Sequence, residues 1–194
     1  DFLHIKNSNF FFLMKKIRCK PKMLFFTGLS ASGKTTLALL LKTKLQKLGI
    51  SNIKYIDGDD FRKRFNYFKY EMKQRNIVGD KKIEYANSFI KLKKLVIVTG
   101  VAADSSWREK IKKKNPHIIE IYIKCPIKVC KSRDFKKNYI KADNNELKNF
   151  VGINNKYQQG KSVDISLNTY IKSKSFNITK IINYLKNNEH IYYQ

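Results

Sequence analysis

The stretch that decides the fold is residues 27–36, "TGLSASGKTT", in which Gly28 to Thr35 fits the pattern GxxxxGK[ST]. An apolar run, 23–27, precedes the stretch, and leucines at three- and four-residue steps follow it as far as Gly49. A strand, a glycine-rich turn and a helix in this order form the context in which the pattern binds phosphate. A small-residue turn without a ligand is the alternative, and the strand and helix on either side argue against it.

The residue types in this stretch explain how it would bind a nucleoside triphosphate. Gly28 and Gly33 let the chain wrap tightly, so that several backbone N–H groups point at phosphate oxygens. Lys34 is expected to reach the β- and γ-phosphates as a catalytic group, and the Thr35 hydroxyl is expected to ligate Mg²⁺. The predicted cofactors are therefore ATP and Mg²⁺. The predicted nucleotide-binding residues here are Gly28, Leu29, Ser30, Ala31, Ser32, Gly33, Lys34, Thr35 and Thr36.

Short apolar runs alternate with amphipathic segments along the rest of the chain. The runs that predict strands are 23–27, 53–57, 95–100, 118–125 and 163–169. This alternation predicts an α/β fold of the P-loop NTPase type, with a parallel sheet of about five strands and helices on both faces. We expect one domain over 23–194, with an irregular stretch at 60–76 and a lid near 132–149.

The chain of 194 residues has a formal net charge of +26, which favours anionic ligands. A basic nucleic-acid-binding ATPase is one alternative, but the lysines are spread along the chain and no zinc or helix-turn-helix pattern occurs. No apolar run approaches the roughly 20 residues needed to cross a bilayer. We therefore expect neither a nucleic-acid nor a membrane partner.

Residues 1–22 are basic and aperiodic, and we interpret them as an N-terminal extension before Met23. A remnant of a targeting segment is the alternative. The three cysteines form no CxxC pair, which is typical of a reducing compartment and predicts a cytoplasmic protein, with organelle targeting as the alternative.

A second candidate site follows the second predicted strand, in "YIDGDDFRKRF" (55–65). Carboxylates at the carboxyl end of a strand lie where open α/β sheets bind ligands, so Asp57 is assigned to substrate binding. Asp59 is predicted to orient the attacking hydroxyl and accept its proton, and Arg62 to pair with an anionic acceptor. An ordinary acidic turn is the alternative.

Three segments together resemble adenylylsulfate (APS) kinases: "GLSASGKTT" (28–36), "YIDGDDFR" (55–62) and "IYIKCPIKVCKSRDFKKNYIKADNNELKNFVGIN" (121–154). The resemblance extends from about Met23 to Thr169. It implies transfer of the γ-phosphoryl group of ATP to the 3′-hydroxyl of adenosine 5′-phosphosulfate, which gives PAPS.

The resemblance also implies roles for single residues. It places Arg133 at ATP and Asp59 at the reacting hydroxyl. Phe150 would stack on the acceptor's adenine. The further acceptor-binding residues that it implies are Arg62, Asn76, Lys136 and Lys141.

Departures from the family pattern gather on the acceptor side. Asp60 replaces an asparagine, Lys73 stands where an arginine is usual, and "GVAADSSWR" (100–108) replaces the family's FISP segment. A related kinase of another anionic nucleotide, such as a cytidine diphosphoramidate, is therefore the alternative function. The expected partner is the small-molecule acceptor. A homodimer is a possible oligomeric state.

Overall fold

The structure is a computed structural model that describes residues 17–161 and 163–193. The targeting question falls mostly on residues 1–16 and lies outside the described residues. The described elements, in chain order, are β1 (Ile17–Cys19), β2 (Met23–Thr27), α2 (Lys34–Lys47), β3 (Ile53–Ile56), α3 (Gly58–Arg64), α4 (Met72–Lys91), β4 (Leu95–Thr99), α5 (Ser105–Lys114), β5 (Ile118–Lys124), α6 (Ile127–Ser132), α7 (Asn138–Asp143), β6 (Ile165–Asn168), α8 (Lys174–Asn187) and β7 (Ile191–Tyr193).

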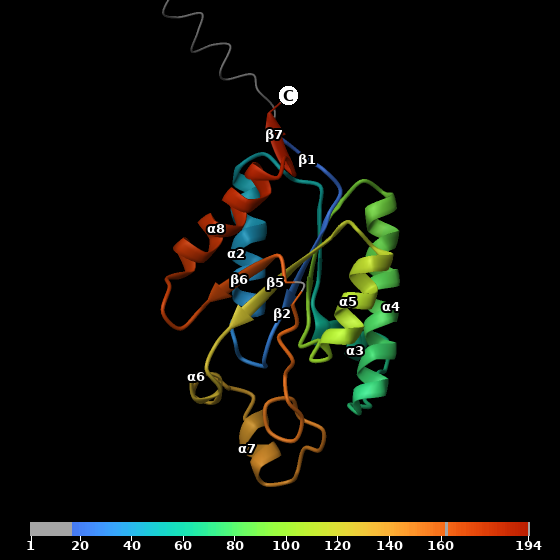
Figure 1. Cartoon of the computed structure of the whole chain (residues 1–194), viewed down its shortest axis with the longest axis vertical. Coiled ribbons are helices and arrows are strands. Elements are labelled where there is room, and N and C mark those ends of the chain that lie inside the picture. The colour runs from blue at the N-terminus through green and yellow to red at the C-terminus, as the bar shows by residue number, and fades with distance from the viewer. Residues whose placement is uncertain (1–16, 162, 194) are drawn as a thin grey trace, which may run out of the picture.

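Five parallel strands form the central sheet, in the order β3-β4-β2-β5-β6. Each strand coincides with one of the five apolar runs, so the predicted fold class is confirmed. β2 and β4 are buried at every position because helices cover both faces of the sheet. The carboxyl ends of the strands point toward α7, at the lower end of Figure 1.

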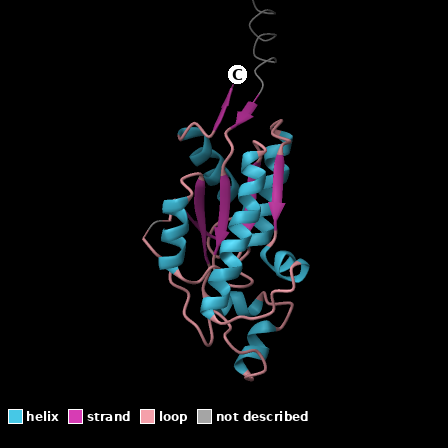
Figure 2. Ribbon diagram, turned by 90° about the vertical axis from the view of Figure 1, so that its right-hand side faces the viewer, coloured by secondary structure: helices cyan, strands magenta, loops and turns pink. Residues whose placement is uncertain are grey.

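Two apolar cores lie on the two faces of the sheet. α2 and α8 cover one face, where their leucines and isoleucines pack on residues such as Phe26 and Ile121. α3, α4 and α5 cover the other face, where Trp107 packs edge-on against Phe25. Figure 2 looks from the α4 side and shows the strands between helices. Packing on both faces therefore fixes the position of the carboxyl ends of the strands, where the site lies.

The N-terminal boundary differs from the expectation that the folded domain starts at Met23. β1 lies within the predicted extension, yet it pairs antiparallel with β7, with Ile17 opposite Tyr193. Ile17 and Cys19 also pack against the first core. Strand pairing and partial burial therefore make residues 17–19 part of the fold, at the end of the molecule opposite α7 (Figure 1).

The stretch at 60–76 is more regular than predicted. Asp57 caps α3 by accepting hydrogen bonds from the backbone N–H groups of Asp59 and Asp60. α4 begins at Met72, and its stripe of Val78, Gly79, Lys82, Ile83 and Ala86 is buried. The lid region, 132–149, begins at the last residue of α6 and contains the short helix α7. No helix of the described residues is long and apolar enough to span a membrane.

Candidate functional site

The phosphate loop joins the end of β2 to the start of α2. Gly28 and Gly33 have φ angles of 136° and 100°, which side chains rarely allow. A Cβ on Gly28 would come within 2.7 Å of the Ile123 carbonyl oxygen, so only glycine fits there. The Lys34 ammonium donates to the Leu29 carbonyl oxygen at 2.5 Å, and burial lowers the pKa of Lys34 to about 8. The loop thus curls around its lysine.

A cavity of about 780 Å³ opens above this loop. The predicted nucleotide-binding residues that line it are Ser30, Ala31, Gly33, Lys34, Thr35, Thr36 and Arg133. Gly28, Leu29 and Ser32 do not line the cavity. Gly28 and Ser32 instead support the turn through backbone hydrogen bonds. Leu29 packs against a small apolar cluster of Cys125, Cys130 and Tyr139. The size and the cationic lining suit a nucleoside triphosphate.

Asp57, predicted to bind substrate, lines this first cavity. Its carboxylate accepts hydrogen bonds from the hydroxyls of Thr35, Tyr55 and Thr99, at 3.1, 2.8 and 3.0 Å. Burial would raise the pKa of Asp57, but the hydroxyls of Tyr55 and Thr99 and the N–H groups at the start of α3 outweigh it and hold that pKa below its ordinary value. An ionised Asp57 therefore lies beside Thr35, in the wall of the first cavity.

The oxygen atoms around Thr35 suit Mg²⁺. No group of three or more His, Cys, Asp or Glu side chains gathers among the described residues to hold a metal alone. Mg²⁺ binds few protein ligands and takes the rest from phosphates and water. A Thr35 hydroxyl with an ionised carboxylate 3.1 Å behind it fits that need.

Two basic residues of the lid line the first cavity. Arg133 donates to the Thr169 carbonyl oxygen at 3.0 Å, which holds the guanidinium at the rim. The Lys136 ammonium forms a 2.8 Å ion pair with Asp59, and this contact raises the pKa of Lys136. Lys141 is exposed and lines neither cavity, so the structure does not bring it to the site.

A second cavity, of about 320 Å³, adjoins the first. The predicted residues that line it are Asp59, Arg62, Asn76, Lys136 and Phe150. Gly58, Asp59, Gly100 and Lys136 line both cavities, so the two spaces meet at the end of β4. The Phe150 ring packs edge-on against Tyr139, with 4.9 Å between ring centroids.

Arg75, Lys82 and Trp107 are among the side chains of the second cavity that sequence reasoning missed. Arg75 directly precedes the predicted Asn76 in the sequence. Lys82 carried a signal, because it interrupts the buried stripe of α4 with a charge. Trp107 carried none, since only the packing of α5 on α4 brings it to the cavity.

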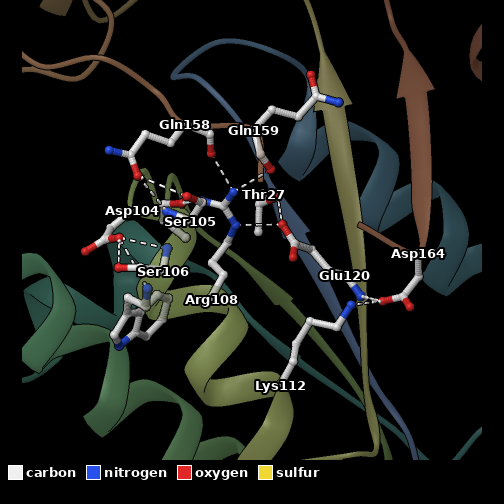
Figure 3. Close-up of polar contacts among 12 residues, drawn as sticks. Thr27, Asp104, Ser105, Ser106, Arg108, Lys112, Glu120, Gln158, Gln159 and Asp164 are labelled. Atoms are coloured by element: carbon white, nitrogen blue, oxygen red, sulfur yellow. Dashed lines mark hydrogen bonds and ion pairs between the residues drawn. The ribbon is translucent and has the colours of Figure 1, made fainter. Parts of the chain in front are cut away.

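The segment 100–108, which departs from the family pattern, turns its arginine away from the site. Arg108 is 1% exposed and forms a 2.7 Å ion pair with Glu120 of β5. It also donates to the carbonyl oxygens of Ala102, Gln158 and Gln159 (Figure 3). Arg108 thus joins α5 and β5 to the chain after the lid, and its role is in packing.

A parallel sheet with this strand order, a phosphate loop at its carboxyl edge and two adjoining cavities define a P-loop kinase of small molecules. Residues 20–168 match the family profile of adenylylsulphate kinase. The chain belongs to the adenylylsulphate kinase family.

Individual relatives agree with this assignment. The adenylyl-sulfate kinase of Clostridium acetobutylicum is 36% identical over 176 residues, covering 89% of this chain and 86% of the relative. The enzyme of the same name from Thermodesulfovibrio yellowstonii is 36% identical over 174 residues, covering 86% of this chain and 84% of the relative. Among solved structures, the Mycobacterium tuberculosis APS kinase CysC, in complex with AMPPNP and APS, is 29% identical with a TM-score of 0.79. That match covers 87% of this chain and 99% of CysC.

Proposed function

We propose that the protein transfers the γ-phosphoryl group of ATP to the ribose 3′-hydroxyl of adenosine 5′-phosphosulfate, which gives PAPS. The observation that carries the proposal is the meeting of the two cavities at Gly58, Asp59, Gly100 and Lys136. A donor in the larger cavity and an acceptor in the smaller one would place their reacting ends there. Membership of the adenylylsulphate kinase family supports the choice of acceptor.

Asp59 would orient the acceptor hydroxyl and accept its proton. The Asp59 side chain is 68% exposed and lines both cavities, where the new bond would form. Lys136 pairs with this carboxylate. Binding of both nucleotides would draw Lys136 toward phosphate and free Asp59 for the hydroxyl.

Cationic side chains would stabilise the charge that develops on the transferred group. Lys34 of the phosphate loop and Arg133 and Lys136 of the lid all line the larger cavity. Fixed charges of this kind lower the barrier to phosphoryl transfer without covalent chemistry. Closure of the lid over both nucleotides would exclude water and limit hydrolysis of ATP.

Mg²⁺ would bind at the Thr35 hydroxyl, with Asp57 hydrogen-bonded behind it. When bound, the metal supplies positive charge to the β- and γ-phosphate oxygens. Asp57 would orient the threonine hydroxyl and help to attract the ion. A homodimer and a cytoplasmic location stay predictions, which sedimentation and cell fractionation would test.

A coupled assay of ADP formation over a panel of acceptors tests the proposal. Adenosine 5′-phosphosulfate should give the highest kcat/KM, above AMP, adenosine and cytidine diphosphoramidate. The altered segment 100–108 makes the comparison with cytidine diphosphoramidate informative. Preference for that compound would replace the proposed acceptor, and ATP hydrolysis indifferent to every acceptor would refute kinase activity of this kind.

A further inference from the structure

Lys82 of α4 places an ammonium group in the wall of the smaller cavity. The residue is only 7% exposed, and its Nζ donates to the Thr99 carbonyl oxygen at 3.1 Å, at the end of β4. The ammonium also lies 5.6 Å from the centre of the Phe25 ring. An ammonium group has three N–H donors, so this one bond leaves further donors for a ligand.

Two glycines make room for this ammonium. A Cβ on Gly100 would lie 2.5 Å from the Lys82 Nζ, and one on Gly58 would lie 3.4 Å from it. Both glycines line the two cavities at the point where they meet. The absence of side chains at these two glycines therefore leaves room for the Lys82 ammonium in the wall of the smaller cavity.

The smaller cavity is strongly cationic. Six basic side chains of the described residues line it against one carboxylate, Asp59, which is already paired with Lys136. The basic residues are Arg62, Lys63, Arg75, Lys82, Lys136 and Lys148. The imbalance indicates a ligand that carries negative charge.

The three least exposed of these cations bond to neutral groups. Arg62 donates to the carbonyl oxygens of Tyr67 and Lys69, and Arg75 donates to those of Tyr70 and Asn149. No ion pair joins Arg62, Arg75 or Lys82 to a carboxylate of the described residues. A buried charge without a counter-charge destabilises a folded protein, so an anionic ligand is the partner that the arrangement lacks.

We propose that Lys82 is a specificity-determining residue that binds the anionic phosphosulfate end of the acceptor, together with Arg62 and Arg75. The proposal rests on the proposed function and names a recognition residue for it. The N–H donors of the ammonium that face the cavity would form charge-assisted hydrogen bonds to phosphosulfate oxygens. Acceptors without a charged 5′ group would gain nothing from Lys82.

A structural role is the competing explanation, because the bond from Lys82 to Thr99 also ties α4 to β4. Two substitutions separate the roles. Lys82→Met removes both the charge and the bond, whereas Lys82→Gln removes the charge but keeps an amide donor for the Thr99 oxygen. Lys81→Met is the matched control, since Lys81 is the neighbouring, exposed lysine of the same helix.

Steady-state kinetics give the first measurement. We expect both Lys82 variants to raise the KM for adenosine 5′-phosphosulfate by about 10- to 100-fold, as loss of a charge-assisted contact does. The KM for ATP should stay within about twofold, and Lys81→Met should resemble the wild type. An unchanged KM for the acceptor, or its restoration in Lys82→Gln alone, would overturn the proposal in favour of the structural role.

Binding without turnover gives the second measurement. Trp107, the chain's one tryptophan, lines the same cavity, so its fluorescence can report acceptor binding in the absence of ATP. The wild type should bind adenosine 5′-phosphosulfate more tightly than adenosine, and Lys82→Gln should lose most of that preference while binding adenosine equally. Equal loss for both ligands would overturn the proposal. If the wild type binds adenosine 5′-phosphosulfate through Lys82 but does not phosphorylate it, the proposed function fails and the recognition role stands.

Discussion

Lys34 is the residue on which nucleotide binding depends most directly. Its ammonium already lies inside the phosphate loop, bonded to the Leu29 carbonyl oxygen. We expect Lys34→Ala to lower kcat by about 100-fold or more, because the charge on the transferred phosphoryl group loses its nearest cation. The coupled assay at saturating ATP measures the effect. Lys44→Ala, at an exposed position of the same helix, is the control, and near-normal turnover of Lys34→Ala would contradict the assigned role.

Asp59 and Asp60 are adjacent, exposed carboxylates that should differ in function. We expect Asp59→Asn to lower kcat by about 100-fold or more with the KM for ATP nearly unchanged, since the hydroxyl loses its proton acceptor. Asp60→Asn should keep most of the activity, because Asp60 lines only the larger cavity. Single-turnover measurements separate the chemical step from binding. A loss confined to ATP affinity would instead assign Asp59 to the metal.

The sequence was sufficient for the residues whose role depends on local chain geometry. The loop around Lys34 and Thr35 is a continuous pattern, so its cavity could be predicted. The cavity that Asp57 lines could not be predicted, because hydrogen bonds from Tyr55 and Thr99 orient its carboxylate, and these residues come together only in the sheet. Lys82 could not be placed either, since the packing of α4 decides which cavity its charge reaches.

At the scale of elements, the contact between α4 and α5 depends on Gly79. A Cβ at this position would lie 2.3 Å from Cζ2 of Trp107. Alanine normally favours a helix over glycine by roughly 1 kcal/mol. We expect the opposite here, a loss of about 1–3 kcal/mol in the free energy of unfolding, because the core is overpacked. Urea denaturation followed by Trp107 fluorescence measures it.

Ser88→Ala, at an exposed position of α4, is the control and should change the free energy of unfolding by less than about 0.5 kcal/mol. If Gly79→Ala is as stable as the wild type, α4 and α5 must separate more easily than the structure indicates. A raised KM for the acceptor in the same variant would show that this contact shapes the smaller cavity.

The elements themselves were predictable to different degrees. The five strands could be predicted because buried parallel strands are continuous apolar runs bounded by polar residues. α3 could not, because its seven residues carry little periodicity and depend on the cap from Asp57. β1 could not either, since its pairing partner β7 lies at the other end of the chain.

At the scale of the whole molecule, the Arg108–Glu120 pair joins parts that are distant in the chain. We expect Arg108→Met to lower the free energy of unfolding by about 3–5 kcal/mol, because Glu120 would be left as an uncompensated buried charge. Adding Glu120→Gln should recover part of the loss. Lys110→Met, exposed on the same helix, is the control. Equal stability of Arg108→Met and the control would contradict this account.

The buried lysines Lys34 and Lys82 give the free energy of unfolding an unusual dependence on pH. Burial lowers the pKa of Lys34 and of Lys82 to about 8, whereas unfolding restores the ordinary value of 10.5. Arg62 and Lys34 lower the pKa of Lys82 further, and Asp57 and Asp59 oppose them. Above about pH 8 the unfolded chain binds more protons than the folded one, so the free energy of unfolding should rise with pH.

This rise has an upper limit. Burial raises the pKa values of Cys19 and Cys130 to about 12 from 9.0, so above about pH 9 the folded protein retains protons that the unfolded chain loses. We therefore expect stability to increase between about pH 8 and pH 9, with about 1 kcal/mol from Lys82 alone. Urea denaturation of the wild type and of Lys82→Met measures the difference. If the free energy of unfolding of the wild type falls between pH 8 and pH 9, the lowered pKa values of Lys34 and Lys82 would be contradicted.

The β1–β7 ribbon also decides how the enzyme can be handled. Ile17 and Tyr193 are paired at the pole opposite the lid, since β1 leads into the amino end of β2 (Figure 1). A bead, a dye or a fused reporter attached at this ribbon would leave the two nucleotide cavities accessible to solvent. Immobilised enzyme prepared in this way should turn over at the rate of the free enzyme, whereas anchoring through the lid should block it.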